Sequence, residues 1–261
     1  MRAAAGLLLA ALFAGPVSAC AVAPWEGRAM DGSLARLDAA AGPVAAWYED
    51  PTTRYAHGVL GDAVEAGTLA VQIAPFPDCR VARVTLPEVE VFEDLAPRLA
   101  DLDGDGRAEL VVVQSHRDLG ARLVVYAAGD EALTLAAATP NIGRPNRWLA
   151  PVGAADLDGD GLTEIAYIDR PHLARTLRVW RYGDGRLTEV AALEGLTNHR
   201  IGDAHIPGGL RDCGDGPEII TADAGWTAVM ATRLTAEGRL DTRPLGPWSD
   251  TAAAAALACA D

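Results

Sequence analysis

The chain has 261 residues, half of them hydrophobic, and its 36 acidic residues outnumber its 22 basic ones, so the formal net charge is −14 at pH 7. This length suits one large domain or two small ones. The charge argues against binding to nucleic acid phosphates or to an anionic membrane surface. It fits a solvated exterior and the binding of cations.

The first residues have the pattern of a signal peptide. Arg2 precedes an apolar run over residues 7–14, Pro16 breaks the run, and Val17-Ser18-Ala19 supplies the small residues of a cleavage site. The run is too short to span a bilayer of about 30 Å, and no later stretch is apolar enough to do so. We therefore expect residues 1–19 to be removed, and the protein to be periplasmic or secreted without a transmembrane segment.

Residues 17–20 also resemble a lipobox, the signal for lipoprotein processing. If it functions as one, Cys20 carries a lipid anchor, and otherwise Cys20 is the first mature residue. Both alternatives remain open at this point.

A repeat dominates the rest of the chain. The segment Asp101–Val113 recurs as Asp156–Ile168, an offset of 55 residues, and a third copy at 211–220 keeps only Gly-Asp-Gly and the strand that follows it. A fainter copy lies near residues 38–48. Self-similarity at such a period indicates a repeat architecture. We predict one domain over 20–261, with units near 38–94, 95–148, 149–205 and 206–261.

Each unit is predicted to contain four short strands separated by turns that contain glycine. The strands of the last three units are expected at 95–100, 110–113, 122–126 and 133–138, at 149–155, 165–168, 177–182 and 187–193, and at 206–210, 219–221, 228–234 and 240–245. Four-stranded units repeated in this way are typical of a β-propeller. We predict an all-β fold, a small propeller of four blades, or five if the N-terminal stretch forms one. The alternative is a β-sandwich with two similar loops.

The C-terminal segment over residues 251–261 aligns with the strand that precedes each loop. We expect it to supply the missing inner strand of the first unit and so to close the ring. The alternative is a terminal helix, which the five consecutive alanines favour.

The two complete loops have the acidic pattern of a calcium site. A hard divalent cation takes six to eight oxygen ligands, and Asp-x-Asp-x-Asp-Gly-x-x-Glu supplies carboxylates at positions 1, 3, 5 and 9 and a carbonyl at 7. An EF-hand is excluded, because its glutamate belongs at position 12. The predicted ligands of two calcium ions are Asp101, Asp103, Asp105, the carbonyl of Arg107 and Glu109, and Asp156, Asp158, Asp160, the carbonyl of Leu162 and Glu164.

The third loop has lost this pattern. Arg211 and Cys213 fall on the first and third acidic positions, and Glu218 lies one residue early, so no metal is expected there. Four cysteines in an exported chain indicate two disulfides. If residues 251–261 form the closing strand, Cys259 lies at the same end of its strand as Cys213 does, which favours that pair. Cys20 with Cys79 follows by elimination.

The loops and their flanks resemble the FG-GAP and VCBS repeats of integrin-like β-propellers, over 101–113 and 156–168 and more weakly over 211–222. With its flanks, such as Asn146–Asp156, the chain looks like the small VCBS-repeat proteins of alphaproteobacteria. The resemblance implies a propeller supported by calcium. The chain is shorter than seven blades require, and the Phe-Gly and Gly-Ala-Pro signatures are absent in full form, with Val152-Gly-Ala-Ala as the nearest trace.

Two classes of function fit this sequence. The first is a binding or scaffold module with structural calcium and an unknown protein or glycan ligand. Its candidate contact residues are Arg54, Tyr55, His57, Arg147, Trp148, His172, Asn198, His199 and Arg200. The second is a hydrolase or lyase acting on polysaccharide, for which His57 with Asp62, or His199 with Asp203, would form the acid–base pair. No familiar hydrolase or metalloprotease motif occurs, so we expect no enzyme and predict no catalytic residues.

Overall fold

The computed structural model describes residues 23–39, 41–74, 80–129 and 132–260. The predicted signal peptide, Cys20 and Cys79 lie outside these ranges. Within them the chain forms eighteen strands, paired antiparallel wherever they pair, and one helix. No helix in the described part is long and apolar enough to cross a bilayer.

The first two groups of strands are joined into one sheet. The first group is β1 (Ala35–Arg36), β2 (Gly42–Thr52), β3 (Glu65–Ala74) and β4 (Val81–Thr85), and the second is β5 (Glu90–Phe92), β6 (Arg98–Ala100), β7 (Glu109–His116), β8 (Gly120–Ala128) and β9 (Leu133–Ala138). The short strand β5 pairs with both β3 and β7, and this makes the sheet continuous.

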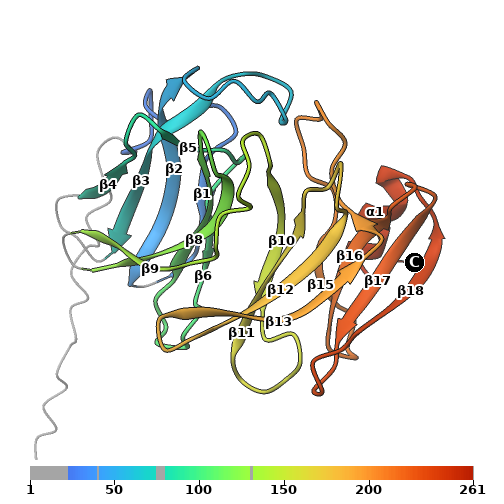
Figure 1. Cartoon of the computed structure of the whole chain (residues 1–261). Helices are drawn as coiled ribbons and strands as arrows, with labels where there is room; N and C mark the ends of the chain where they lie inside the picture. The colour runs from blue at the N-terminus through green and yellow to red at the C-terminus, as the bar shows by residue number, and fades with distance from the viewer. Residues whose placement is uncertain (1–22, 40, 75–79, 130–131, 261) are drawn as a thin grey trace, which may run out of the picture.

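The third and fourth groups form separate sheets. The third is β10 (Leu149–Ala155), β11 (Thr163–Asp169), β12 (Thr176–Gly183) and β13 (Arg186–Glu194), paired in chain order. The fourth is β14 (Leu196–Thr197), β15 (Gly209–Asp212), β16 (Pro217–Asp223), β17 (Ala228–Leu234) and β18 (Leu240–Pro247). The groups follow one another across the molecule in chain order (Figure 1).

Burial changes in the same direction across the last three groups. The second strands, β7, β11 and β16, are buried along nearly their whole length, whereas the last strands are more exposed, β13 and β18 largely and β9 in part. Strands covered on both faces consist of near-continuous apolar runs, and Leu110–Val113 in β7 is one. Each of these three groups therefore has an inner side, packed against its neighbours, and a more exposed outer edge.

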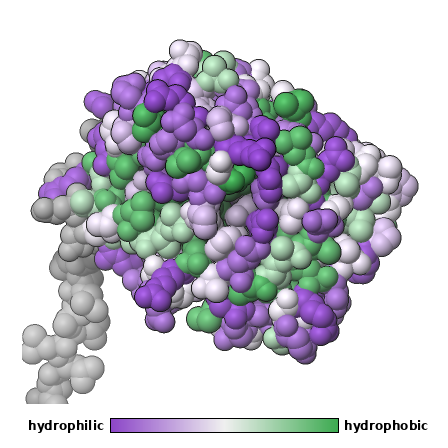
Figure 2. All heavy atoms as spheres, viewed as in Figure 1, coloured by the Kyte–Doolittle hydropathy of each residue, from purple (hydrophilic) through white to green (hydrophobic). Residues whose placement is uncertain are grey.

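The core lies between the groups. Val111 and Val125 of the second group pack in one cluster with Leu149 and Ile165 of the third. A further cluster joins Ile168 of the third group to Ile219 of the fourth. Figure 2 shows hydrophilic side chains spread over much of the face seen in Figure 1, with hydrophobic ones among them.

Turn chemistry fixes the hairpins. In the β12–β13 turn, both Asp184 (φ 50°) and Gly185 (φ 67°) have positive φ. A two-residue turn of this kind matches the twist of paired strands and favours Asp-Gly. The sequence Gly-Asp-Gly-Arg thus positions β13 against β12.

The C-terminal segment corrects one prediction. It forms a helix, α1 (Asp250–Leu257), instead of a ring-closing strand. Ser249 caps the helix by accepting a hydrogen bond from the Ala252 amide, which satisfies one of its free N–H groups. Ala253 and Ala256 are buried against β16 and β17, in a cluster with Ile220 and Val229. A capped alanine run with a buried face is more stable as a helix than as a strand.

Two long loops meet across the molecule. The Gly202 amide donates to the Val59 carbonyl at 3.0 Å, and a Cβ on Gly61 would lie 2.9 Å from the Gly202 oxygen. Val59 also packs in the cluster shared by the second and third groups. The connection between β2 and β3 therefore reaches the connection between β14 and β15.

Candidate metal centre

The first acidic loop lies between β6 and β7. Asp101, Asp103 and Glu109 each offer a carboxylate oxygen, and these oxygens all lie within 4.8 Å of one another. The aspartates are exposed and Glu109 is buried. Three carboxylates converging around a buried member form a donor set suited to a hard cation.

Glycines make the curl of this loop possible. One Asp101 oxygen, Oδ1, accepts from the Gly104 amide at 2.8 Å, and Oδ2 accepts from the Gly106 amide at 2.9 Å. Both glycines have positive φ, at 77° and 85°, where residues with a Cβ are disfavoured. The backbone can therefore wrap around the first aspartate.

The carboxylates of the first loop repel one another. The pKa of Glu109 is raised to about 7, chiefly by burial and also by the charges of Asp103, Asp105 and Asp101, while the hydrogen bond from the Leu102 amide lowers it. Asp105 does not belong to the converging group, and its Oδ1 accepts from the Arg107 amide at 2.7 Å. Ligation by Asp105 and by the Arg107 carbonyl stays a prediction.

The second loop, between β10 and β11, repeats this geometry. Asp156, Asp158 and Glu164 converge in the same way, and Asp156 accepts from the Gly159 and Gly161 amides at 2.8 and 3.0 Å. Glu164 accepts from the Leu157 amide at 2.8 Å, as Glu109 does from Leu102. Asp160 lies outside the group, and the Leu162 carbonyl stays a predicted ligand.

One side chain distinguishes the two loops. Arg181, on β12, contacts Asp158 at 2.5 Å, Asp160 at 3.0 Å and Glu164 at 2.6 Å. It faces Glu164 because the two residues pair across β11 and β12. In the first loop Leu110 pairs with Tyr126, which puts Ala127 beside Glu109. Arg181 was not predicted as a site residue, although its place on the second strand after the loop can be found from the repeat.

The comparisons with known proteins concern this region. A family model described as an FG-GAP-like repeat matches residues 101–167, a segment that contains both loops. This segment is therefore similar to FG-GAP-like repeats. No curated protein sequence matches the chain.

Among solved structures, the chain is similar to the crystal structure of the exotype rhamnogalacturonan lyase YesX. The TM-score is 0.49 and the sequence identity 16%, over 84% of this chain and 48% of that one. The chain thus spans about half the length of that structure.

The third loop departs from the FG-GAP-like pattern in a way that corrects the sequence alignment. Arg211 pairs with Glu218 across β15 and β16, as Ala155 pairs with Glu164. Arg211 therefore precedes the loop, and Asp212 takes the first position. Asp212 Oδ1 accepts from the Gly214 and Gly216 amides at 2.8 and 3.2 Å. The loop is two residues shorter and lacks the second aspartate.

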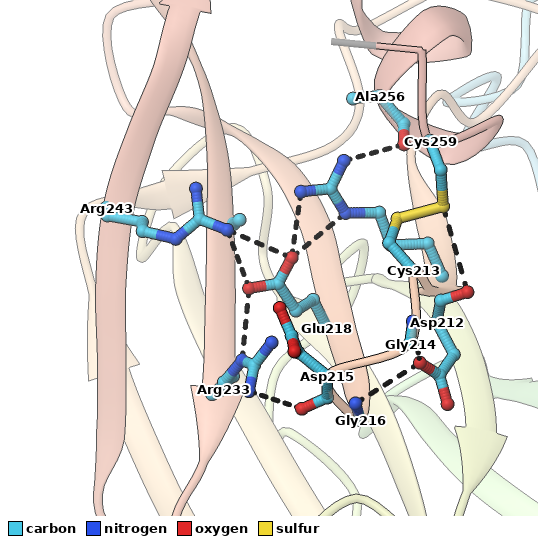
Figure 3. A network of polar contacts seen from close by, with 12 residues as sticks. Asp212, Cys213, Gly214, Asp215, Gly216, Glu218, Arg233, Arg243, Ala256 and Cys259 are labelled. Carbon is cyan, nitrogen blue, oxygen red and sulfur yellow. Dashed lines mark hydrogen bonds and ion pairs between the residues drawn. A yellow bond between two sulfur atoms is a disulfide. The ribbon is translucent and has the colours of Figure 1, made fainter.

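Guanidinium groups surround the glutamate of this third loop (Figure 3). Arg211 donates to Glu218 Oε2 at 2.8 and 3.0 Å, Arg233 to Oε1 at 3.1 Å, and Arg243 to Oε1 at 2.9 Å. Burial raises the pKa of Glu218, but these three partners outweigh it and hold the pKa below its ordinary value. Fixed cations compensate this carboxylate, so the loop has no need of a metal ion.

The predicted pairing of Cys213 with Cys259 is confirmed. The two residues form a disulfide with a Cα–Cα distance of 5.6 Å. It joins the third loop to the end of α1, and Arg211 Nη1 reinforces this contact by donating to the Ala256 carbonyl at 2.8 Å (Figure 3).

The predicted contact residues include buried and exposed ones. Tyr55, Trp148, Asn198 and His199 are buried. Arg200 is exposed and stacks over Trp226. The expected histidine pairs differ from the sequence interpretation. His57 bonds to Glu93, at 2.5 Å, instead of Asp62. His199 contacts the Asp203 backbone carbonyl, at 2.9 Å, instead of its carboxylate.

Proposed function

We propose that the chain is an exported β-propeller that binds two structural calcium ions and acts as a binding or scaffold module. The observation that carries the calcium proposal is that the carboxylates of Asp101, Asp103 and Glu109 converge, with Glu109 buried. The second loop repeats this arrangement with Asp156, Asp158 and Glu164. Bound calcium would neutralise carboxylates that repel one another in a loop between two paired strands. This is a structural role.

A four-bladed arrangement fits the four groups of strands, since each of the last three has a buried inner strand and a more exposed outer strand. The Gly202–Val59 hydrogen bond supports closure through loops. Export is supported by the disulfide, because such bonds persist in oxidising compartments. Removal of residues 1–19, and lipid attachment at Cys20, are both tested by the mass of the mature N-terminal peptide.

Calcium binding is tested by thermal unfolding with calcium and with a chelator. At a free calcium concentration about tenfold above the dissociation constant, each site contributes roughly 1.4 kcal/mol to the free energy of unfolding. We expect the calcium-dependent rise in Tm to shrink in both Asp103→Ala and Asp158→Ala and to vanish in the double variant. Asp215→Ala, in the third loop, is the matched control and should keep the full rise. If both single variants keep it, the loops are not the calcium sites.

A further inference from the structure

A cavity of about 160 Å³ opens between four loops, away from the acidic sites. Its lining includes His57, Arg147, Trp148 and His172, with Leu173 and Ile201. Leu173 and Ile201 are 62% and 70% exposed, so they present apolar surface at the opening. The volume is on the scale of a cavity that holds one benzene ring, roughly 150 Å³.

The hydrogen bonds of two histidines fix which ring nitrogen can accept from a ligand. Burial lowers the pKa of His172 to about 4, with His199 and His57 acting in the same direction, and burial also lowers the pKa of His199. Both rings are therefore neutral at pH 7. His199 Nε2 must carry its proton, because its partner is the Asp203 carbonyl, which only accepts.

The chain of donors then continues. His199 Nδ1 is left as an acceptor, so His172 Nε2, at 3.0 Å from it, is the donor. A neutral imidazole carries one proton, and His172 Nδ1 therefore keeps a free lone pair. The cavity gains an acceptor for a ligand hydroxyl group.

His57 has the opposite role. Its Nδ1 bonds to Oε1 of Glu93, whose side chain is fully buried and whose Oε2 accepts from the Ser115 hydroxyl. A net charge on this buried pair is costly, so a charge-neutral pair is favoured. Whether its proton lies on Glu93 or on Nδ1, His57 Nε2 then carries a hydrogen. His57 thus offers a donor to the cavity.

Arg147 adds a positive charge at the same place. Among the described residues its side chain donates one hydrogen bond, to the Asn146 carbonyl, and forms no ion pair. Two lining residues, Asn146 and Arg170, have positive φ, at 51° and 46°. Such strained residues tend to cluster at binding sites.

We propose that this cavity binds a small hydroxy acid. Arg147 and His57 hold the carboxylate, His172 Nδ1 accepts from the hydroxyl group, and Leu173 and Ile201 cover the body of the ligand. The proposal rests on the proposed binding role of the chain and gives it a ligand class. It does not depend on calcium.

Titration of the full-length chain, followed by NMR of backbone amides, tests this. The probes are mandelate and glucuronate, an aromatic hydroxy acid and a sugar acid, against mandelamide and glucose as neutral counterparts and phenylacetate as the acid without a hydroxyl group. We expect at least one hydroxy acid to shift the amides of 146–148 and 170–173. Its neutral counterpart should bind at least tenfold more weakly, and so should phenylacetate if mandelate is the ligand. The acid that binds shows whether the ligand is an aromatic hydroxy acid or a sugar acid.

Arg147→Gln and His172→Phe should each weaken that binding at least tenfold, while Arg239→Gln, at a 65% exposed side chain, should leave it unchanged. The proposal is overturned if neither acid shifts these amides, or if the neutral counterparts bind equally well. It is also overturned if both cavity variants bind like the original chain. Such failure in a protein whose Tm still responds to calcium leaves the proposed calcium sites intact.

Discussion

At the scale of single residues, the three loops form a series in which the buried glutamate gains arginine partners. The described hydrogen bond of Glu109 is from the Leu102 amide, whereas Glu164 pairs with Arg181 and Glu218 pairs with three arginines. The pKa of Glu109 is raised and that of Glu218 is lowered, as the charge around each predicts. The negative charge that is left for a metal ion to neutralise therefore falls from the first loop to the third.

Arg181 should make the second loop the weaker calcium site. A cation that binds Asp158 and Glu164 must displace the guanidinium group from both. In an Asp103→Ala background, which leaves only the second loop, we expect Arg181→Ala to tighten calcium binding roughly tenfold, or about 1.4 kcal/mol. Isothermal titration calorimetry measures this directly.

The control for this comparison is Arg186→Ala, an exposed arginine on the same hairpin. It lacks ion pairs to the loop in the described structure, so it should leave the calcium affinity unchanged. An unchanged or weaker affinity in Arg181→Ala would show that the guanidinium group does not compete with the ion.

At the scale of elements, the positions of strands were easier to predict than the contacts between residues far apart in the sequence. β9, β10 and β17 have the predicted bounds, because apolar runs between glycine turns are a local signal. α1 was assigned wrongly, since the alignment with earlier units outweighed the local signal of Ser249 and the alanines. The Glu93 partner of His57 lies 36 residues away, and only tertiary packing brings them together. The acidic loops were found because their ligands are close in sequence.

The disulfide between Cys213 and Cys259 should stabilise the terminal helix and the whole chain. It closes a segment with a sequence separation of 46 residues, for which the entropy of the unfolded chain gives about 4 kcal/mol as an upper value. We expect Cys213→Ser with Cys259→Ser to lower the free energy of unfolding by about 2–4 kcal/mol in urea titration.

Hydrogen exchange at the amides of Ala258 and Cys259 shows where the loss arises. These amides bond to carbonyls at the end of α1, and they should exchange faster in the double variant. A loss below about 1 kcal/mol with unchanged exchange would mean that Arg211 and the apolar face hold the helix without the disulfide.

At the scale of the molecule, the groups of strands are arranged in chain order, and contacts between loops join distant groups. The Trp148 indole donates to the Glu93 carbonyl at 2.8 Å, and Asn198 donates to Ala150 and Pro151. With the Gly202–Val59 bond, these contacts connect all four groups on the side where the histidine cavity lies. No periodicity in the sequence predicts them, because they differ from unit to unit.

Gly61 is the position that tests closure through these loops. An alanine Cβ there would lie 2.9 Å from the Gly202 backbone oxygen, at φ 99°. Gly143 has a similar φ of 94° with nothing within 4 Å of a Cβ, so Gly143→Ala carries only the backbone strain. That strain costs more than about 1 kcal/mol in either variant. We expect Gly61→Ala to lower Tm further than Gly143→Ala, because it also separates the two loops.

Hydrogen exchange at the Gly202 amide distinguishes this from general destabilisation. That amide donates to Val59, so separation of the loops should speed its exchange in Gly61→Ala but not in Gly143→Ala. Buried amides of β7 and β11 should keep their protection in both variants under native conditions, since their partners lie within their own sheets. Equal exchange at Gly202 in the two variants would mean that the loop contact does not hold the groups together, and that packing between neighbouring sheets does so alone.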